Sequence, residues 1–343
     1  MHPLRLSHMC VASSLGNGLD TLLAALQSGR VGLRPCTFEA STVPTYTGAI
    51  DALDAMTLAT DLAPFDCRNN RLAELALRQD GFEAAVQAAR LRHGATRIGL
   101  FLGTSTSGIL EAEHAYQARD PATGALPANF HYRTTQNTFS LAAFLQQRLG
   151  ISGPALVVSC ACASTAKAFG NAARMLAAGL CDAAIVGGAD SLCLTTLHGF
   201  ASLNLTAPGP CRPAAGDRDG ISIGEAAGFV LLERGPPRAS EVMLLGIGES
   251  SDAYHMSQPH PEGEGARLAM AAALHRANLA SEQVDYINLH GTGTRANDQA
   301  EANAIENAIE KVLERNFRTG DIYTNGTTLL GTKEMSAKIV ELL

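Results

Sequence analysis

Short apolar runs and segments of helical periodicity alternate along the chain. Apolar runs bounded by turn residues predict buried strands at 96–103 (TRIGLFLG) and 154–161 (PALVVSCA). Helices are predicted at 137–150 and 164–179, where glycines follow the last periodic residues. Further strands are predicted at 181–190, 225–234, 241–253 and 284–294, the last running into a loop, and a further helix at 264–279. This alternation predicts an α/β protein with largely buried sheets.

One sequence pattern occurs twice, in opposite halves of the chain. GLFLGTSTSG (99–108) and INLHGTGTRA (287–296) both predict a strand that runs into Gly-Thr-x-Thr. Such an echo is what a duplicated α/β unit would leave in the sequence.

Composition narrows the class of protein. The 343 residues are 46% hydrophobic, which is enough for a large core in one domain or two fused halves. A net charge of −7 without a long basic run argues against nucleic acid as a partner. No apolar run approaches the roughly 20 residues of a membrane helix, and the N-terminus lacks the pattern of a signal peptide. We therefore expect a cytoplasmic protein that does not enter a membrane.

The eight cysteines form no Cys-x-x-Cys pair, so neither a zinc site nor a disulfide framework is predicted. Two of them, Cys160 and Cys162, lie one residue apart in VVSCACASTAKAFGNAARML (157–176). Metal binding would need two more ligands, and a disulfide between them would be strained. Two interpretations remain open: packing residues, the usual role of cysteine, and a nucleophile.

The nucleophile interpretation has a physical basis for Cys162. The first turn of the following helix carries unpaired N–H groups and partial positive charge, which favour a thiolate. The same N–H groups can receive an oxyanion formed on a carbonyl that the thiolate attacks. Cys160, in contrast, is expected to be a small core residue of the preceding strand.

Four ordered segments resemble the β-ketoacyl-[acyl-carrier-protein] synthases, the elongating type of the thiolase superfamily. The resemblance covers roughly residues 1–303 and places Cys162 at the nucleophile and His290 at the first catalytic histidine. The four segments are CACASTAKAFGNAARMLAAGLCDAAIVGGAD, CRPAAGDRDGISIGEAAGFVLLE (211–233), ESSDAYHMSQPHPEGEG (249–265) and DYINLHGTGTRANDQAE (285–301).

The resemblance implies a thiolase fold, with two pseudo-duplicated halves in a five-layered α-β-α-β-α core. It also implies a homodimer, acyl carrier protein as partner, and no cofactor or metal. Cys162 would take an acyl chain as a thioester, and a decarboxylated malonyl extender would attack it, with His290 stabilising the enolate.

Other positions acquire roles by the same resemblance. Thr292 and Thr294 match residues that hydrogen-bond the pantetheine arm, although hydroxyls in a turn also satisfy backbone groups. Ile221 matches a position that lines the acyl pocket and is otherwise a core residue. Glu301 matches a glutamate that pairs with a catalytic lysine and is otherwise a solvated helix residue.

The chain departs from the family pattern after His290, because no histidine follows it. The segment GTKEMSAK (331–338) partly echoes the motif of the second histidine, with Lys333 as the catalytic lysine and Lys338 in place of the histidine. Three of the four lysines also fall in the last 33 residues. The tail, 304–343, resembles the C-terminal end of isocitrate and isopropylmalate dehydrogenases instead.

We therefore expect three parts: a nucleophile-bearing half (1–240), an incomplete second half (241–303) and an atypical tail (304–343), the C-terminal part being truncated or replaced. The function expected is decarboxylative condensation in fatty-acid or polyketide-type synthesis, impaired by that tail. The alternatives are a non-catalytic partner subunit and an inactive chimeric chain. A dehydrogenase would need a nucleotide site that the sequence lacks, and a thiolase would need a cysteine after Cys211.

Overall fold

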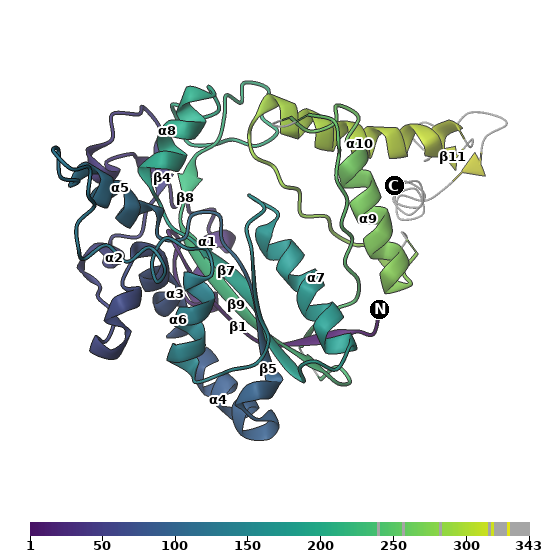
Figure 1. The fold of residues 1–343 in the computed structure, drawn as a ribbon. Coiled ribbons are helices and arrows are strands. Elements are labelled where there is room, and N and C mark those ends of the chain that lie inside the picture. Colours follow the sequence, from purple (N-terminus) through teal and green to yellow (C-terminus); the bar gives the residue numbers. More distant parts are fainter. Residues whose placement is uncertain (239–240, 256–257, 281–282, 315–316, 319–327, 330–343) are drawn as a thin grey trace. The chain divides into compact units, whose positions relative to one another are not determined.

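A computed structural model describes residues 1–238, 241–255, 258–280, 283–314, 317–318 and 328–329, with side chains as far as residue 304 (Figure 1). The chain divides into two compact units, each of which is described by itself. The sheet unit consists of Leu4–Pro210 and Ser222–Met243. The helix unit consists of Met1–Pro3, Cys211–Ile221 and the described residues from Leu244 onward.

A seven-stranded mixed sheet forms the centre of the sheet unit, with strand order β10-β1-β9-β7-β5-β6 and β2 paired to β1. Strand β5 pairs in parallel with β6 and β7, whereas β9 runs antiparallel to β7 and β1. The strands are β1 (Leu4–Ser13), β2 (Gly16–Asn17), β5 (Ile98–Gly103), β6 (Ala155–Val158), β7 (Ala183–Asp190), β9 (Ala226–Arg234) and β10 (Val242–Leu244).

Helices cover both faces of this sheet (Figure 1). On one face lie α3 (Arg68–Leu77), α4 (Phe82–His93) and α6 (Ser140–Leu149), and on the other lies α7 (Ser164–Ala177). Alternation along β5 explains the two layers, because Leu100 and Leu102 join the core under α3 and α6, while Gly103 faces α7.

Smaller elements complete the sheet unit. A second sheet has strand order β3-β4-β8, and four shorter helices and three 3₁₀ turns connect the larger elements. These elements are β3 (Arg34–Pro35), β4 (Tyr46–Gly48), β8 (Ile223–Gly224), α1 (Leu19–Gln27), α2 (Ala52–Ala55), α5 (Ile109–Gln117), α8 (Leu194–Ser202), and the turns Phe38–Ala40, Thr60–Phe65 and Ala95–Arg97.

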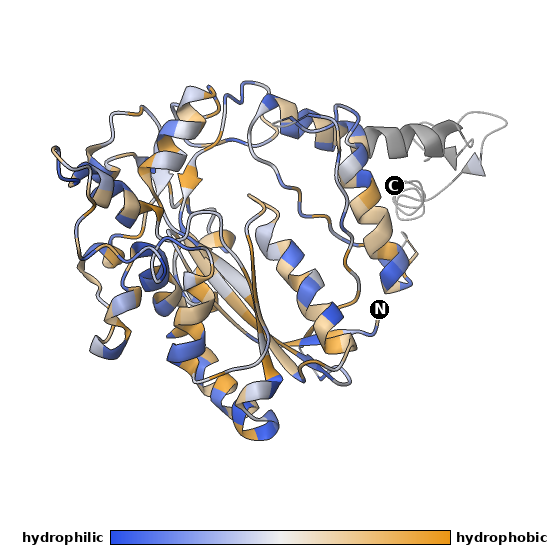
Figure 2. Cartoon of the chain, in the orientation of Figure 1, coloured by the Kyte–Doolittle hydropathy of each residue, from blue (hydrophilic) through white to orange (hydrophobic). Residues whose placement is uncertain are grey.

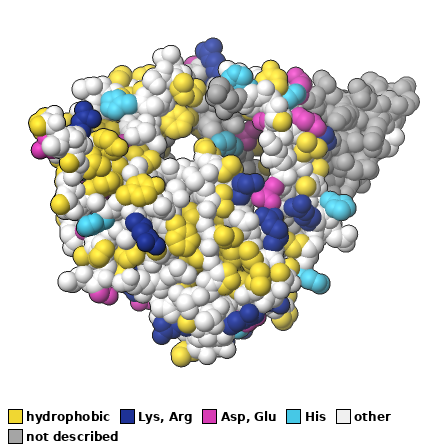
Figure 3. All heavy atoms as spheres, in the orientation of Figure 1, with side chains coloured by type: hydrophobic (Ala, Val, Ile, Leu, Met, Phe, Trp, Pro, Cys, Tyr) yellow, Lys and Arg dark blue, Asp and Glu magenta, His cyan; other side chains and the backbone are white. Residues whose placement is uncertain are grey.

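Apolar residues concentrate in the central strands and on the helix faces toward them (Figure 2). On the surface in Figure 3, hydrophobic side chains also occur over α7 and the neighbouring edge of the sheet. Among the described helices, none is both long and apolar enough to cross a bilayer.

The helix unit contains α9 (Glu264–Ala277), α10 (Arg295–Glu314) and the paired short strands β11 (Phe317–Arg318) and β12 (Thr328–Leu329). Two strand predictions are wrong here. Of 241–253 only Val242–Leu244 is a strand, and the described part of 284–294 contains none. A strand needs a hydrogen-bonded neighbouring strand. The residues after Leu244 and the described part of 284–294 pair with no other strand among the described residues.

The remaining predicted elements are confirmed, with ends that shift by a few residues. Helix α6 ends at Leu149, and Gly150 follows it in the left-handed region with φ 62°. Helix α7 ends at Ala177, two residues before Gly179, whose φ is 70°. Both helices therefore end just before the glycines that the sequence analysis used to predict their C-termini.

Candidate active site

The turn that carries Cys162 connects the end of β6 to the start of α7. Val158 is the last residue of the strand and Ser164 the first of the helix, and Ala161 between them has a positive φ of 45°. Cys162 is exposed in this unit. Cys160 is exposed as well, so its expected place in the core is wrong: the strand ends two residues before it.

Ser164 organises this turn through its hydroxyl group. The hydroxyl accepts the backbone N–H of Cys160 at 2.8 Å and donates to the carbonyl of Ala161 at 2.6 Å. Ser105 donates to the same carbonyl at 3.1 Å. The carbonyl of the strained residue is thus held from two sides. Neither serine was among the predicted site residues, although a serine directly before an apolar helix is a common sign of a helix start.

Glycines allow the start of α7 to approach the carboxyl ends of the parallel strands. A Cβ atom on Gly103 of β5 would lie 2.5 Å from the backbone nitrogen of Thr165, and one on Gly188 of β7 would lie 2.7 Å from the Thr165 hydroxyl. Both glycines are therefore required by close packing. The result places Cys162 at the strand ends where α/β proteins commonly bind ligands.

The other cysteines differ from this pair in burial. Desolvation raises the pKa of the Cys10 thiol to about 12, and desolvation also raises the pKa of the buried thiols of Cys67, Cys181 and Cys193. These four thiols remain protonated at neutral pH and are poor nucleophiles. Cys36 and Cys211 are half-buried, which leaves Cys160 and Cys162 as the two exposed thiols.

The candidate histidine lies in the helix unit, in the loop before α10. The Glu301 carboxylate accepts the backbone N–H of His290 at 2.7 Å and that of Gly291 at 2.8 Å, and the Asn297 side chain donates to it at 3.0 Å. Glu301 therefore fixes the loop backbone from which His290 projects, a role that neither of its two interpretations included.

Asp298, one turn earlier on α10, holds the next part of the loop. Its carboxylate accepts the N–H groups of Gly293 at 3.1 Å and Ala214 at 2.9 Å, and lies 3.2 Å from the Arg218 guanidinium. Cys211 donates its thiol to the Thr292 carbonyl at 3.2 Å. The segment 211–218 and the histidine loop are thereby joined, although about eighty residues separate them.

Both Gly-Thr-x-Thr loops are held by carboxylates. In the sheet unit, Asp190 accepts the N–H groups of Ser105 at 2.6 Å and Thr106 at 2.9 Å. In the helix unit, Asp298 and Glu301 bind the backbone of the second loop. The two halves thus share a local device as well as a sequence pattern.

Local partners engage the two candidate pantetheine-binding hydroxyls. The Thr292 and Thr294 hydroxyls lie 2.9 Å apart, and Thr294 also accepts the N–H of Asn297 at 3.3 Å at the start of α10. Ile221 is half-buried at the end of the segment 211–221. The hydroxyls satisfy backbone groups and each keeps further hydrogen-bonding capacity.

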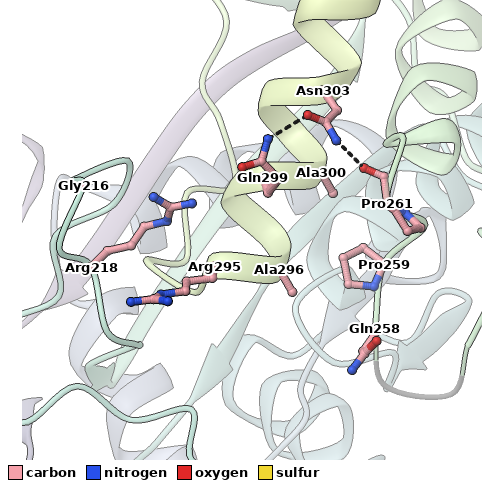
Figure 4. Close-up of a pocket in the computed structure, with 10 residues that line it drawn as sticks. All are labelled: Gly216, Arg218, Gln258, Pro259, Pro261, Arg295, Ala296, Gln299, Ala300 and Asn303. Carbon is pink, nitrogen blue, oxygen red and sulfur yellow. Dashed lines mark hydrogen bonds between the residues drawn. The ribbon is translucent and has the colours of Figure 1, made fainter.

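A pocket of about 570 Å³ opens beside the first turns of α10 (Figure 4). Two guanidinium groups, of Arg218 and Arg295, lie on one side of the helix, and the amides of Gln258, Gln299 and Asn303 also line the pocket. Asn303 donates to the Pro261 carbonyl at 2.8 Å and accepts from Gln299 at 2.8 Å. The Arg218 guanidinium is already paired with Asp298, so Arg295 and the amides are the groups that favour an anionic or strongly polar ligand.

The predicted catalytic residues are distributed over separate parts of the chain. Cys162 and His290 belong to different units, and Lys333 and Lys338 lie outside the described residues. Within the described ranges, no three histidine, cysteine or acidic side chains cluster as a metal site would require.

Comparison with known proteins covers both units. The family model described as "Beta-ketoacyl synthase, N-terminal domain" matches residues 9–237, and the corresponding C-terminal domain model matches residues 242–318, beyond the expected boundary near 303. The 3-oxoacyl-[acyl-carrier-protein] synthase 2 of Coxiella burnetii is 32% identical over 86% of this chain and 74% of its own. The synthase of the same name from Vibrio cholerae is 29% identical over 97% of this chain and 81% of its own.

A solved structure of a ketosynthase in complex with its chain length factor, from Xenorhabdus doucetiae, is also similar. It is 35% identical with a TM-score of 0.79, and covers 99% of this chain and 82% of its own. These likenesses confirm the α/β thiolase fold that the four segments imply.

Proposed function

Because the chain belongs to the β-ketoacyl synthase family, we propose that it condenses an acyl chain held on Cys162 with a malonyl group in fatty-acid or polyketide-type synthesis. The observation that carries the proposal is the exposed Cys162 at the turn into α7, whose first N–H groups can receive an oxyanion. No other exposed thiol has this place at a helix start.

The proposed reaction has two stages. In the first, the Cys162 thiolate attacks the acyl thioester of acyl carrier protein, a new carbon–sulfur bond forms, the bond to the carrier's sulfur breaks, and the carrier leaves as a thiolate. In the second, malonyl carrier protein loses carbon dioxide, and the resulting enolate attacks the acyl carbonyl. A carbon–carbon bond forms and Cys162 leaves as a thiolate. His290 would donate a hydrogen bond to the enolate oxygen.

Intact-protein mass spectrometry with acyl carrier protein tests the nucleophile. The native chain should gain one acyl group, Cys162→Ala should gain none, and Cys160→Ala should behave as the native chain does. Acylation that follows Cys160, or survives in Cys162→Ala, would overturn the assignment. A native chain that is folded but never acylated would instead favour the alternative of a non-catalytic partner subunit.

A second assay separates the role of His290 from that of Cys162. His290→Ala should still become acylated but should release carbon dioxide from malonyl carrier protein much more slowly than the native chain. Equal loss of both steps would show that His290 acts only through the fold of its loop. Lys333→Ala, measured alongside, tests whether the GTKEMSAK segment supplies a third catalytic group.

We also propose that the pocket of Figure 4 receives the phosphate of the carrier's phosphopantetheine arm, beside Thr292 and Thr294. Arg295 has no ion pair with a described residue, so its guanidinium is available to an anion. Arg295→Ser should raise KM for malonyl carrier protein while leaving kcat near native. Arg119→Ser, which removes an equal charge from an exposed site of the sheet unit, should leave KM unchanged. Equal KM values for the two variants would contradict this role.

A homodimer is proposed from the edge of the sheet at β6. Its outer backbone has no partner among the described residues, and Leu156 on it is 39% exposed. Such an edge is stable when another strand covers it. Leu156→Lys should yield monomers in light scattering, whereas Val242→Lys on β10 at the opposite edge should remain dimeric. A native chain that is monomeric at all concentrations would refute the proposal.

Two further assignments follow as proposals. We place the protein in the cytoplasm, since none of its eight cysteines forms a disulfide; fractionation of its source cells tests this.

We divide the chain into halves at residues 240 and 241, supported by the two carboxylate-held loops, with an atypical tail after residue 303. Limited proteolysis should cut the full chain first near residue 240, and a first cut elsewhere would contradict the division.

A further inference from the structure

A second pocket lies in the sheet unit, at the end of the sheet opposite to Cys162. Strand pairing locates it: Ala183, at the start of β7, pairs with both Ile98 at the start of β5 and Glu233 near the end of β9. Cys162 follows the carboxyl ends of the parallel strands, whereas this pocket adjoins their amino ends. It encloses about 340 Å³ between the start of β1, the end of α4 and the end of β9. It is therefore separate from the candidate active site.

Arg5 lines this pocket and is only 6% exposed. Its guanidinium donates to the Glu233 carboxylate at 3.2 Å. Its Nε lies 3.7 Å from the Glu241 carboxylate, which is too far for a hydrogen bond. That buried Nε makes no hydrogen bond with any described residue. A buried donor without an acceptor is costly, and a ligand with acceptor oxygens would remove the cost.

Further cations surround Arg5. Arg92 contacts Glu233 at 2.6 Å with a half-exposed side chain, and the exposed Arg238 makes no side-chain ion pair with a described residue. Arg234 is already engaged, because its guanidinium donates to the carbonyl of Leu176 in α7 and to that of Cys181, in the loop before β7.

Four guanidinium groups therefore face two carboxylates, those of Glu233 and Glu241, and the pocket keeps a positive excess. His8 and His93 also line it and would add to the excess when protonated. Burial opposes ionisation of Glu233, but hydrogen bonds from Ser7 and Arg92 outweigh it and lower its pKa. The charge count above therefore treats this carboxylate as negative. The excess charge is left for a ligand.

We propose that this pocket binds the phosphate group of a small anion through Arg5, Arg92 and Arg238. A tetrahedral phosphate offers several oxygens to converging guanidinium groups, which bind such oxygens in pairs. The volume exceeds that of inorganic phosphate and leaves room for a short organic group. The proposal is independent of the condensation chemistry at Cys162.

Calorimetric titration of the full chain at constant ionic strength tests the proposal, with inorganic phosphate and glycerol 3-phosphate as probes. We expect saturable binding at one site, at least tenfold weaker in Arg238→Ser and unchanged in the charge-matched control Arg119→Ser. Tighter binding of the ester would identify a phosphorylated small molecule as the ligand, and equal binding would identify free phosphate; either result supports the pocket.

Two results would overturn it. One is the absence of saturable binding by either probe at millimolar concentrations, and the other is equal weakening by Arg238→Ser and Arg119→Ser, which would indicate a general charge effect. Because Arg238 is exposed, its variant should unfold at the native temperature. Acylation of Cys162 measured in the same variant should equal that of the native chain, since the pocket lies at the other end of the sheet.

Discussion

The carboxylate of Glu301 accepts the backbone N–H of His290 at 2.7 Å, so a side chain of α10 holds the backbone of the candidate catalytic histidine in position. The same carboxylate also holds Gly291 and Asn297. Glu301 is therefore a positioning residue for the loop, and its loss should affect the step that needs His290 more than the step that needs Cys162.

We expect Glu301→Ala to slow decarboxylation of malonyl carrier protein about ten- to a hundredfold, since a hydrogen bond to a charged group contributes about 1.5–3 kcal/mol. Acylation of Cys162 should change little. The two rates are measured separately by carbon dioxide release and mass spectrometry. Glu264→Ala, which removes a half-buried carboxylate paired with Arg267 on α9, is the matched control, and a similar loss in the control would argue against a local effect.

The close approach of α7 to β5 gives a second prediction. Gly103→Ala would place a methyl group 2.5 Å from the Thr165 nitrogen and force the start of α7 away from the sheet. Overpacking of this kind costs about 1–3 kcal/mol, so both the melting temperature and the acylation rate should fall. Gly199→Ala has no neighbour within 4 Å and lies inside α8, so it should be neutral or stabilising. Similar melting temperatures for the two variants would contradict the packing argument.

A buried ion pair supports the third prediction. Arg68 and Glu225 form two hydrogen bonds, at 2.7 and 2.8 Å, with side chains 6% and 0% exposed. Removing one partner leaves an uncompensated buried charge, so Arg68→Met should lower the free energy of unfolding by about 3–5 kcal/mol. Arg71→Met breaks the more exposed pair with Asp66 and should cost about 0–1 kcal/mol. Urea unfolding measures both, and equal midpoints would refute the distinction.

Ionisation of Glu111 should make the stability of the protein depend on pH. Burial raises the pKa of its carboxyl group, although the N–H of Arg68 and other partners act in the opposite direction. An acid whose pKa is raised on folding loses stability as pH rises through the unfolded and then the folded pKa. Glu111→Gln cannot ionise, so its melting temperature should exceed that of the native chain more at pH 8 than at pH 5. Asp61→Asn removes an exposed carboxylate of the same unit as a control, and the same change in melting temperature between pH 5 and pH 8 in both variants would contradict this role of Glu111.

Local signals in the sequence predicted much of the sheet unit. Gly150 marked the end of α6 because only a residue tolerant of positive φ stops a helix in that way. The apolar run around Leu100 marked β5 because both of its faces are buried. Such signals are carried by a few neighbouring residues and survive without knowledge of the rest of the chain.

Long-range relationships could not be predicted in this way. Cys211 donates to the Thr292 carbonyl, and Asp298 binds Ala214, across more than eighty residues of sequence. The apolar segment around Ile287 has the composition of a strand, but composition does not supply the neighbouring strand that a ladder requires. Cys160 was misplaced for a related reason, because the end of β6 depends on its pairing with β5.

The first two turns of α10 carry both carboxylates that hold the histidine loop, Asp298 and Glu301, three residues apart. Each residue inserted into a helix rotates the remainder of that helix by about 100°. One inserted or deleted residue between them would therefore turn one carboxylate away from the loop, whereas many substitutions on the outer side of these turns would leave both in place. The number of residues in these turns is therefore more constrained than their identity. A related chain with an alignment gap at residues 299–300 should lack one of the two carboxylate contacts to the histidine loop.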